Sequence, residues 1–220
     1  MKTSQVAART GLYLLLFAVV GALPVVDVSI GLFHNSQYFS EYSLVELTQS
    51  AVLTFSILAA VVITRRHLLP YLGFLLAALL LCALIREFDF LLDRGFEGLW
   101  ELGVTTVLLC TALYLVPNRK TLQSELAFLA THFSFGIMLA GFAVTAGFSR
   151  MFGRGSFWQD LMGATYDRSV KNYAEEGVEL AGYVLLMAGV IEFSIAAVRH
   201  FGLSPERVTG SRRPSPASRS

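Results

Sequence analysis

The chain has 220 residues, of which 55% are hydrophobic and only 15% are charged, with a formal net charge of +1. A soluble domain usually carries roughly a quarter charged residues, and here the hydrophobic residues are gathered into runs long enough to cross a bilayer. Composition therefore excludes an ordinary soluble domain and predicts an all-α, polytopic membrane protein.

Six apolar spans are predicted, each able to cross a hydrocarbon core of ~30 Å as a helix. The first could instead be a cleaved signal peptide, because basic residues precede it and small residues lie near Ala22. Its length favours an uncleaved helix. The expected fold is a six-helix transmembrane domain over residues 1–203, followed by a disordered cytoplasmic tail over 204–220. The spans are 10–33, 43–64, 68–90, 98–116, 122–148 and 177–198.

The charged residues between the spans predict the orientation. Lys and Arg collect near the N-terminus, in the short connections at 65–67 and 117–120, and in the tail, whereas most Asp and Glu fall at the opposite ends of the spans. Because basic connections tend to stay inside, both termini are expected in the cytoplasm. The expected partner is the lipid bilayer, and no nucleic acid.

Three of the spans begin with similar sequences, which suggests a repeated helical hairpin. SLVELTQSAVL, EGLWELGVTTVL and EEGVELAGYVL each place a Glu-Leu pair after a bulky apolar residue. Glu-Leu is a common pair, but internal repeats recur in membrane transport folds. The pattern therefore predicts three helical hairpins of similar design.

A layer of acidic side chains is expected at the outer ends of the spans. A helix rises about 1.5 Å per residue, so residue counts from the basic connections bring acids from five spans to a similar depth. Acids in the first turn of a helix can simply interact with its free N–H groups, and Glu46, Glu101 and Glu179 are expected there. The alternative is a vestibule for a cation, a proton or a small cationic solute. The candidate ligand-binding layer is Asp27, Glu46, Arg86, Glu87, Asp89, Glu101 and Glu179.

Three ionisable residues are predicted inside the membrane, where burial of charge is expensive and a functional role is the default hypothesis. Glu125 and His132 are seven residues apart on one helical face, and Glu192 lies about two turns inside the last span. One interpretation is a proton or cation path formed by Glu125, His132 and Glu192. The other is a set of interhelical hydrogen bonds, such as Glu192 to Asn118 or Arg119.

The long segment 149–176 is predicted to be an outer loop. Apolar residues recur at helical spacing from Ser156 to Tyr173, which favours an amphipathic helix at the membrane interface. The chain contains no GxSxG, HExxH, P-loop or GxGxxG motif, and its two cysteines, Cys82 and Cys110, lack metal-binding spacing. No cofactor or metal site is predicted, and whether the protein is an enzyme stays open.

Two segments resemble a known group of proteins: IREFDFLLD at the end of the third span and EEGVELAGY at the start of the last. They are similar to a loosely defined group of uncharacterised bacterial inner-membrane proteins. The resemblance covers the outer ends of the second, third, fourth and sixth spans. It implies a bacterial multi-pass protein and no function.

Three functions are compatible with these patterns. The leading expectation is a protein that binds or passes a cation, a proton or a small cationic solute at the outer carboxylate layer. The second is a membrane-embedded enzyme acting on a lipid or lipid-linked substrate at the outer leaflet, with Glu87 or Asp89 as acid or base. The third is a structural subunit of a membrane complex.

Overall fold

The computed structural model describes residues 3–30 and 43–202. Within these ranges the chain is helical apart from short turns, with no strands, as expected of an all-α fold. The predicted tail at 204–220 lies outside the described residues. In chain order the elements are α1 (Thr3–Ile30), α2 (Leu44–Arg65), α3 (Pro70–Glu87), α4 (Asp89–Asp93), α5 (Leu99–Leu115), α6 (Arg119–Ala130), α7 (Phe133–Ala143), the π-helical turn η1 (Val144–Phe148), α8 (Ser149–Phe152), α9 (Gly155–Met162), the 3-10 turn η2 (Gly163–Thr165) and α10 (Arg168–Gly202).

Four helical segments among the described residues are long and apolar enough to cross a membrane: α2, α3, the run Phe133–Phe152 and most of α10. α5 and α6 pass the same test only together and are bent by 103°, so they form at most one broken span. α1 is continuous, but its apolar part, Gly11–Asp27, is shorter than the ~20 residues usually needed. The six-span prediction is therefore confirmed only in its coarser form, as a multi-pass membrane protein.

The outer surface of the bundle is rich in apolar side chains, as expected for contact with lipid. Leu47, Phe55, Leu113 and Phe142 each expose more than half of their surface. In water such a surface would favour association, because large exposed apolar patches are disfavoured there. Lipid tails are as apolar as leucine, so the same surface is compatible with a bilayer.

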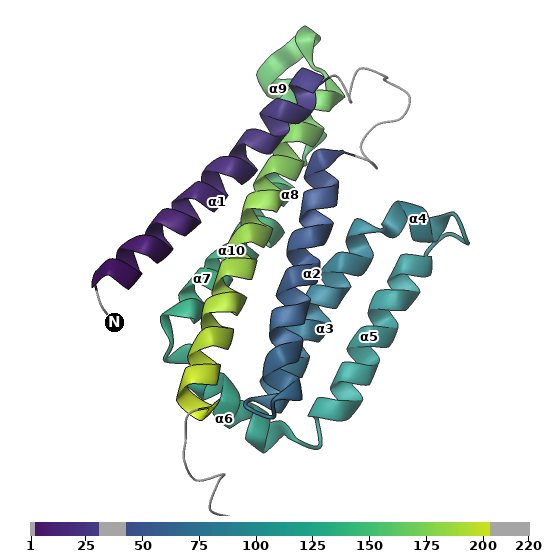
Figure 1. Ribbon diagram of the computed structural model, residues 1–220. Helices are drawn as coiled ribbons and strands as arrows, with labels where there is room; N and C mark the ends of the chain where they lie inside the picture. Colours follow the sequence, from purple (N-terminus) through teal and green to yellow (C-terminus); the bar gives the residue numbers. More distant parts are fainter. Residues whose placement is uncertain (1–2, 31–42, 203–220) are drawn as a thin grey trace, which may run out of the picture.

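The predicted span 122–148 is not a single helix, because the chain turns at Thr131 and His132. His132 has an extended backbone (φ −97°, ψ 139°), and its Nδ1 accepts a hydrogen bond from the Ser134 N–H at 3.3 Å, which caps α7. α6, which begins with the polar sequence RKTLQSE, lies across the lower end of the bundle in Figure 1. Since α5 and α6 meet at 103° whereas α2 and α3 pack directly as a hairpin, the predicted repeat of three similar hairpins is not confirmed.

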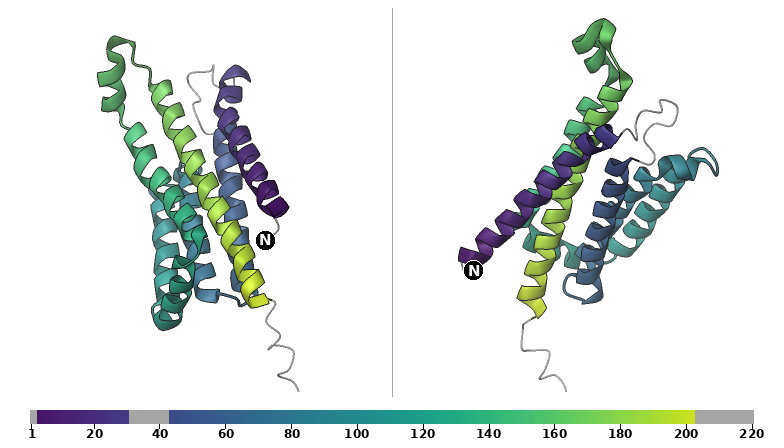
Figure 2. Two further views of the ribbon diagram at one scale, coloured as in Figure 1. Left: turned by 90° about the vertical axis from the view of Figure 1, so that its left-hand side faces the viewer. Right: turned by 45° about the horizontal axis from the view of Figure 1, so that its top comes forward.

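α10 is the central helix of the bundle and packs against α1, α2 and α7. α3 packs on α2, and α5 packs on α3, so α5 lies at one edge of the bundle and α1 at the other (Figure 1, Figure 2). The core lies mainly between α2 and α10, where Leu53, Val184 and Phe193 are completely buried. This packing places the polar residues of α2, α3 and α10 next to one another.

The two ends of the bundle differ in charge. At one end, which we call the acidic end, Glu46 of α2, Glu87 of α3 and Glu179 of α10 line one cavity. At the other end, the basic end, Arg66 lies in the turn between α2 and α3, and Lys120 lies in the first turn of α6. Acidic and basic side chains thus gather toward opposite ends of α2.

Two helix pairs approach closely because glycine replaces a side chain at the crossing. At Gly182 in α10, a Cβ atom would lie 2.9 Å from the Thr145 backbone nitrogen and 3.0 Å from the Gly141 carbonyl oxygen. At Gly73 in α3, a Cβ atom would lie 2.9 Å from the Ala60 carbonyl oxygen in α2. Small residues are a common means of close packing between membrane helices. The approach of α10 to the α7–η1 segment thus depends on Gly182.

The predicted amphipathic helix at 156–173 is divided in the structure. α9 ends at Gly163, which has a positive φ of 57°, and the turn η2 follows before α10 begins. The exposed Asp167 carboxylate accepts a hydrogen bond from the Ser169 N–H at 2.9 Å; this contact caps α10 and holds the pKa of the carboxyl below its usual value. Because α10 starts earlier than expected, Glu179 lies about 16 Å along the helix and not in its first turn.

Candidate functional site

The structure brings five of the seven predicted outer residues to one cavity at the acidic end. Glu46 from α2, Arg86 and Glu87 from α3, Asp89 from α4 and Glu179 from α10 line a space of about 230 Å³. Three further residues complete its lining, namely Gln49, Arg150 and Glu176. We call this space the acidic pocket, since its five carboxylates outnumber its two guanidinium groups.

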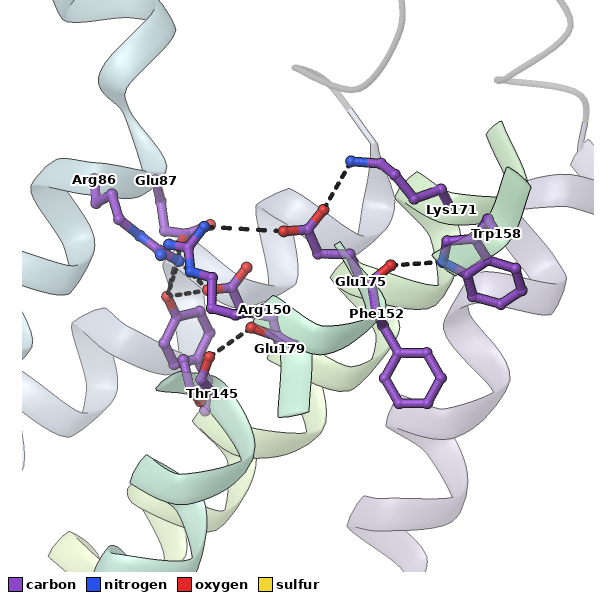
Figure 3. Close-up of polar contacts among 11 residues, drawn as sticks. Arg86, Glu87, Thr145, Arg150, Phe152, Trp158, Lys171, Glu175 and Glu179 are labelled. Atoms are coloured by element: carbon purple, nitrogen blue, oxygen red, sulfur yellow. Dashed lines mark hydrogen bonds and ion pairs between the residues drawn. The ribbon is translucent and has the colours of Figure 1, made fainter. Parts of the chain in front are cut away.

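Arg86 is the centre of the polar contacts in the acidic pocket (Figure 3). Its Nη2 donates hydrogen bonds to Glu179 Oε1, to Glu87 Oε1 at 3.2 Å and to Tyr183 Oη at 3.1 Å. Tyr183 in turn donates to Glu87 Oε1 at 2.6 Å. One cation and one hydroxyl therefore hold two carboxylates from different helices, and removal of Arg86 would leave two largely buried charges without compensation.

A second group of ion pairs lies at the rim of the acidic pocket. Arg150 in α8 lies 3.9 Å from Glu175 in α10, and Lys171 lies 3.1 Å from the other oxygen of the same carboxylate. The Arg150 side chain is more than half exposed. Exposed pairs of this kind contribute little to stability, so Arg150 is available to exchange Glu175 for another anion.

Two predicted members of the layer do not line the acidic pocket. Glu101 lies in the first turn of α5, as predicted, but its side chain is exposed and away from the pocket. Asp27 is completely buried, and its carboxylate faces the first backbone N–H groups of α2, at Leu44 and Val45. The structure therefore separates Asp27 and Glu101 from the five residues that line the acidic pocket.

Asp27 and Glu176 are unusual because their buried oxygens lack well-formed hydrogen bonds. Neither oxygen of Asp27 has such a partner among the described residues, and the same holds for Glu176 Oε2. The two charges interact with each other and with Tyr173. Glu176 also lies within electrostatic range of Glu87 and other carboxylates. An acidic pair thus lies between α1 and α10, and one of its members lines the acidic pocket.

The predicted intramembrane path is only partly assembled at the basic end. His132 and Glu192 line one cavity of about 470 Å³, together with Arg9 and Arg199. Glu192 accepts hydrogen bonds from Arg9 Nη1 at 3.0 Å and from Tyr13 Oη at 2.6 Å. Glu192 thus makes interhelical hydrogen bonds, as the second interpretation expected, but its partners are Arg9 and Tyr13 of α1 and not Asn118 or Arg119.

Glu125 has a structural contact that separates it from that cavity. Its Oε2 accepts a hydrogen bond from the Leu72 N–H at 2.6 Å, and the neighbouring Tyr71 N–H also faces the carboxylate. These are N–H groups of the first turn of α3, which has no side-chain cap of its own. Glu125 thus caps α3 from α6, and it does not line the cavity that contains His132 and Glu192.

Several residues of these sites were not singled out in the sequence. Glu176 lies three residues before the predicted Glu179 and Tyr183 lies four residues after it, which places all three on one face of α10. Glu176 was missed because it precedes the predicted start of the last span. Gln49, which donates to the Glu176 carbonyl oxygen at 3.1 Å, lies three residues after Glu46 on α2. Helical spacing alone could have indicated these residues.

The donor set does not favour a metal site. Among the described residues, no group of three or more His, Cys, Asp or Glu side chains is arranged to hold a metal ion. The two cysteines are both unpaired thiols. The chemistry that the acidic pocket offers is therefore electrostatic attraction and hydrogen-bond acceptance.

Comparison with known proteins finds no family model, no curated protein and no solved structure that matches this chain. The resemblance to bacterial inner-membrane proteins stays an expectation, and the function has to be argued from the site.

Proposed function

We propose that this protein binds a proton or a small monovalent cation in the acidic pocket, with Asp27 and Glu176 at the buried side of the site. The observation that carries the proposal is the Asp27 carboxylate, which is 0% exposed and has no well-formed hydrogen bond among the described residues. The N–H groups of Leu44 and Val45 face this carboxylate, but no ion pair among the described residues neutralises it. An ionised carboxylate without a counter-charge is costly to bury, so such a group takes up a proton or pairs with a cation.

The charge of the acidic pocket supports the same proposal. Its lining contains five carboxylates and two guanidinium groups. One of these guanidinium groups, that of Arg86, already donates hydrogen bonds to Glu87 and Glu179. The lining therefore holds three more carboxylates than guanidinium groups. A cleft lined by one sign of charge raises the local concentration of the opposite ion, so cations would collect at the entrance to the buried pair.

We propose further that the protein lies in a bacterial inner membrane with its basic end in the cytoplasm. The motivation for the orientation is the set of basic residues at and beside the short connections, including Arg65, Arg66, Arg119 and Lys120, because such residues set the orientation of membrane helices. The acidic pocket would then open on the outer side. Reporter fusions at residue 67 and at residue 95 would give opposite signals if this orientation holds.

The experiment that tests cation binding compares Asp27→Asn and Glu176→Gln with wild type, and uses Glu101→Gln as the matched control. Glu101 is an exposed carboxylate at the same end of the bundle and outside the acidic pocket. The thermal stability of the purified protein in detergent is measured against NaCl at constant ionic strength, with N-methylglucamine as replacement, and separately against pH.

In wild type and in Glu101→Gln, the free energy of unfolding should rise by about 1.4 kcal/mol for each tenfold increase in the free ion concentration above the dissociation constant. If the ion is a proton, the native state binds more protons than the unfolded chain, and stability falls as pH rises. Asp27→Asn and Glu176→Gln should lose this dependence. Equal dependence in all four proteins would refute the proposal, and flux across liposomes would then distinguish a binding protein from one that passes the ion.

The two other functions inferred from the sequence are less well supported. An enzyme acting on lipid would need Glu87 or Asp89 as a free acid or base, but Glu87 accepts hydrogen bonds from both Arg86 and Tyr183. Asp89 is exposed and accepts a hydrogen bond from the N–H of its neighbour Phe90. A structural subunit would give no ion dependence, so the same titration separates it from the proposal.

A further inference from the structure

A long apolar groove adjoins the acidic pocket. It has a volume of about 600 Å³ and lies between α3, α5, α7 and α10, within the ~300–1,000 Å³ range of small-molecule sites. Its α3 wall is formed by Leu76, Leu79, Leu80 and Ala83, which lie on one helical face and lead to Arg86. The distance from Leu76 to Arg86 along the helix is about 15 Å, which is half of a ~30 Å hydrocarbon core.

The depth of this groove matches a single lipid leaflet. In a bilayer, an open apolar groove between helices is filled by acyl chains whatever the protein does, because lipid is the solvent there. Any selectivity must therefore come from the groups at its polar end.

Arg86 and Arg150 line both the groove and the acidic pocket. All three hydrogen bonds of Arg86 to described residues are donated by one atom, Nη2. A guanidinium has five N–H donors, so Nε and Nη1 of Arg86 can still donate to a ligand. Among the residues that the structure describes, Arg150 has a single ion pair, the long contact of 3.9 Å to Glu175. Arg86 and Arg150 thus lie between the apolar groove and the carboxylates of the acidic pocket, and both have N–H groups that can donate to a ligand.

We infer that the groove and the acidic pocket together bind one aminophospholipid. Its acyl chain lies in the groove, its phosphate contacts Arg86 and Arg150, and its primary ammonium group reaches the carboxylates of Asp89 and Glu176. The inference rests on the proposed function, because the ammonium group occupies the cation site. The site runs from apolar to positive to negative, and such a lipid runs in the same direction from apolar acyl chain to negative phosphate to positive ammonium, so the charges are complementary at each position.

The same order of charges argues against other phospholipids. A phosphatidylglycerol shares the phosphate and the acyl chains, but it presents hydroxyl groups to an excess of carboxylates. A phosphatidylcholine carries the positive charge but has no N–H group to donate to a carboxylate. Hydrogen bonds between charged partners are stronger than neutral ones, so the primary ammonium should be preferred over both.

The test is native mass spectrometry of the full chain in detergent with equal amounts of phosphatidylethanolamine, phosphatidylglycerol and phosphatidylcholine of identical acyl chains. Wild type should retain phosphatidylethanolamine about tenfold better than either competitor. Asp89→Asn and Glu176→Gln should abolish the preference over phosphatidylglycerol, whereas Arg150→Gln should weaken all three lipids.

The groove is tested by Leu139→Trp, with Leu113→Trp as the matched control. Leu139 lines the groove and is 54% exposed, and Leu113 is 69% exposed on α5 and does not line it. Both substitutions add an indole to a lipid-facing position, so both proteins should fold. Leu139→Trp should reduce retention of every lipid about tenfold, and Leu113→Trp should match wild type.

Equal retention of the three lipids by wild type would overturn the inference, and so would a preference that survives both Asp89→Asn and Glu176→Gln. The ion titration described above separates this failure from failure of the proposed function. If lipid preference is absent while the response that depends on Asp27 persists, only the lipid inference is wrong. If the preference is present and the ion response is absent, only the monovalent-ion proposal is wrong.

Discussion

Replacement of Glu125 by alanine should destabilise the protein by removing the cap of α3. The Glu125 side chain is 6% exposed and reaches from α6 to the Leu72 N–H, which donates to it at 2.6 Å. The first four N–H groups of a helix have no partner inside the helix, and Pro70 has no N–H at all. Loss of the carboxylate therefore leaves the N–H groups of Tyr71 and Leu72 buried without an acceptor.

The expected cost follows from these contacts. Loss of a side-chain cap costs about 0.5–2 kcal/mol, and loss of a hydrogen bond to a charged group costs about 1.5–3 kcal/mol. Removal of a buried charge recovers part of this sum. We therefore expect Glu125→Ala to lower the free energy of unfolding by about 2 kcal/mol, and Glu125→Gln, which keeps an acceptor, to lower it by about half as much.

The assay is equilibrium unfolding in mixed detergent micelles, with Ser124→Ala as the control. Ser124 is the exposed neighbour of Glu125, and its hydroxyl bonds only to the Thr121 carbonyl oxygen, so its loss should change stability by less than about 0.5 kcal/mol. Hydrogen exchange gives a local readout, because the Leu72 amide should lose protection in Glu125→Ala. If Glu125→Ala is as stable as Ser124→Ala, and Leu72 remains protected, the cap assignment is wrong.

Two further predictions concern helix packing and the Arg86 contacts. Gly182→Ala should destabilise the protein by about 1–3 kcal/mol, because the new Cβ atom would meet the Thr145 backbone. Thermal unfolding measures the change, and the control Gly136→Ala should unfold at the wild-type temperature, because no atom lies within 4 Å of its Cβ position. Tyr183→Phe should cost about 1–3 kcal/mol by removing a donor to Glu87. Tyr114→Phe, at an exposed tyrosine, should cost less than about 0.5 kcal/mol in the same denaturation assay.

The helical, membrane-embedded character could be read from the sequence because a chain in lipid must satisfy its backbone hydrogen bonds internally. Runs of apolar residues then predict helices of defined length, and α2 and α3 closely follow their predicted spans. The break at His132 was missed because hydropathy continues across it. Its cause is local geometry, namely a side-chain nitrogen that caps α7.

The candidate site was predicted in one dimension only. A fixed rise per residue placed Glu46, Glu87 and Glu179 at a common depth, and the structure brings these residues to one cavity. The same arithmetic also selected Glu101, which points away, and could not show that Glu125 caps another helix. Rotation about each helix axis depends on which faces pack together, and the apolar residues on all sides of a membrane helix leave that rotation undetermined.

The sequence by itself determined that the chain is helical, that its helices are apolar enough for a lipid environment, and near which helix ends its charged residues lie. Tertiary structure alone decided which carboxylates share a cavity and which of them Arg86 contacts. The physical reason is that hydropathy and helical rise act along the chain, whereas Arg86, Glu179 and Tyr183 meet only when α3 and α10 are brought together.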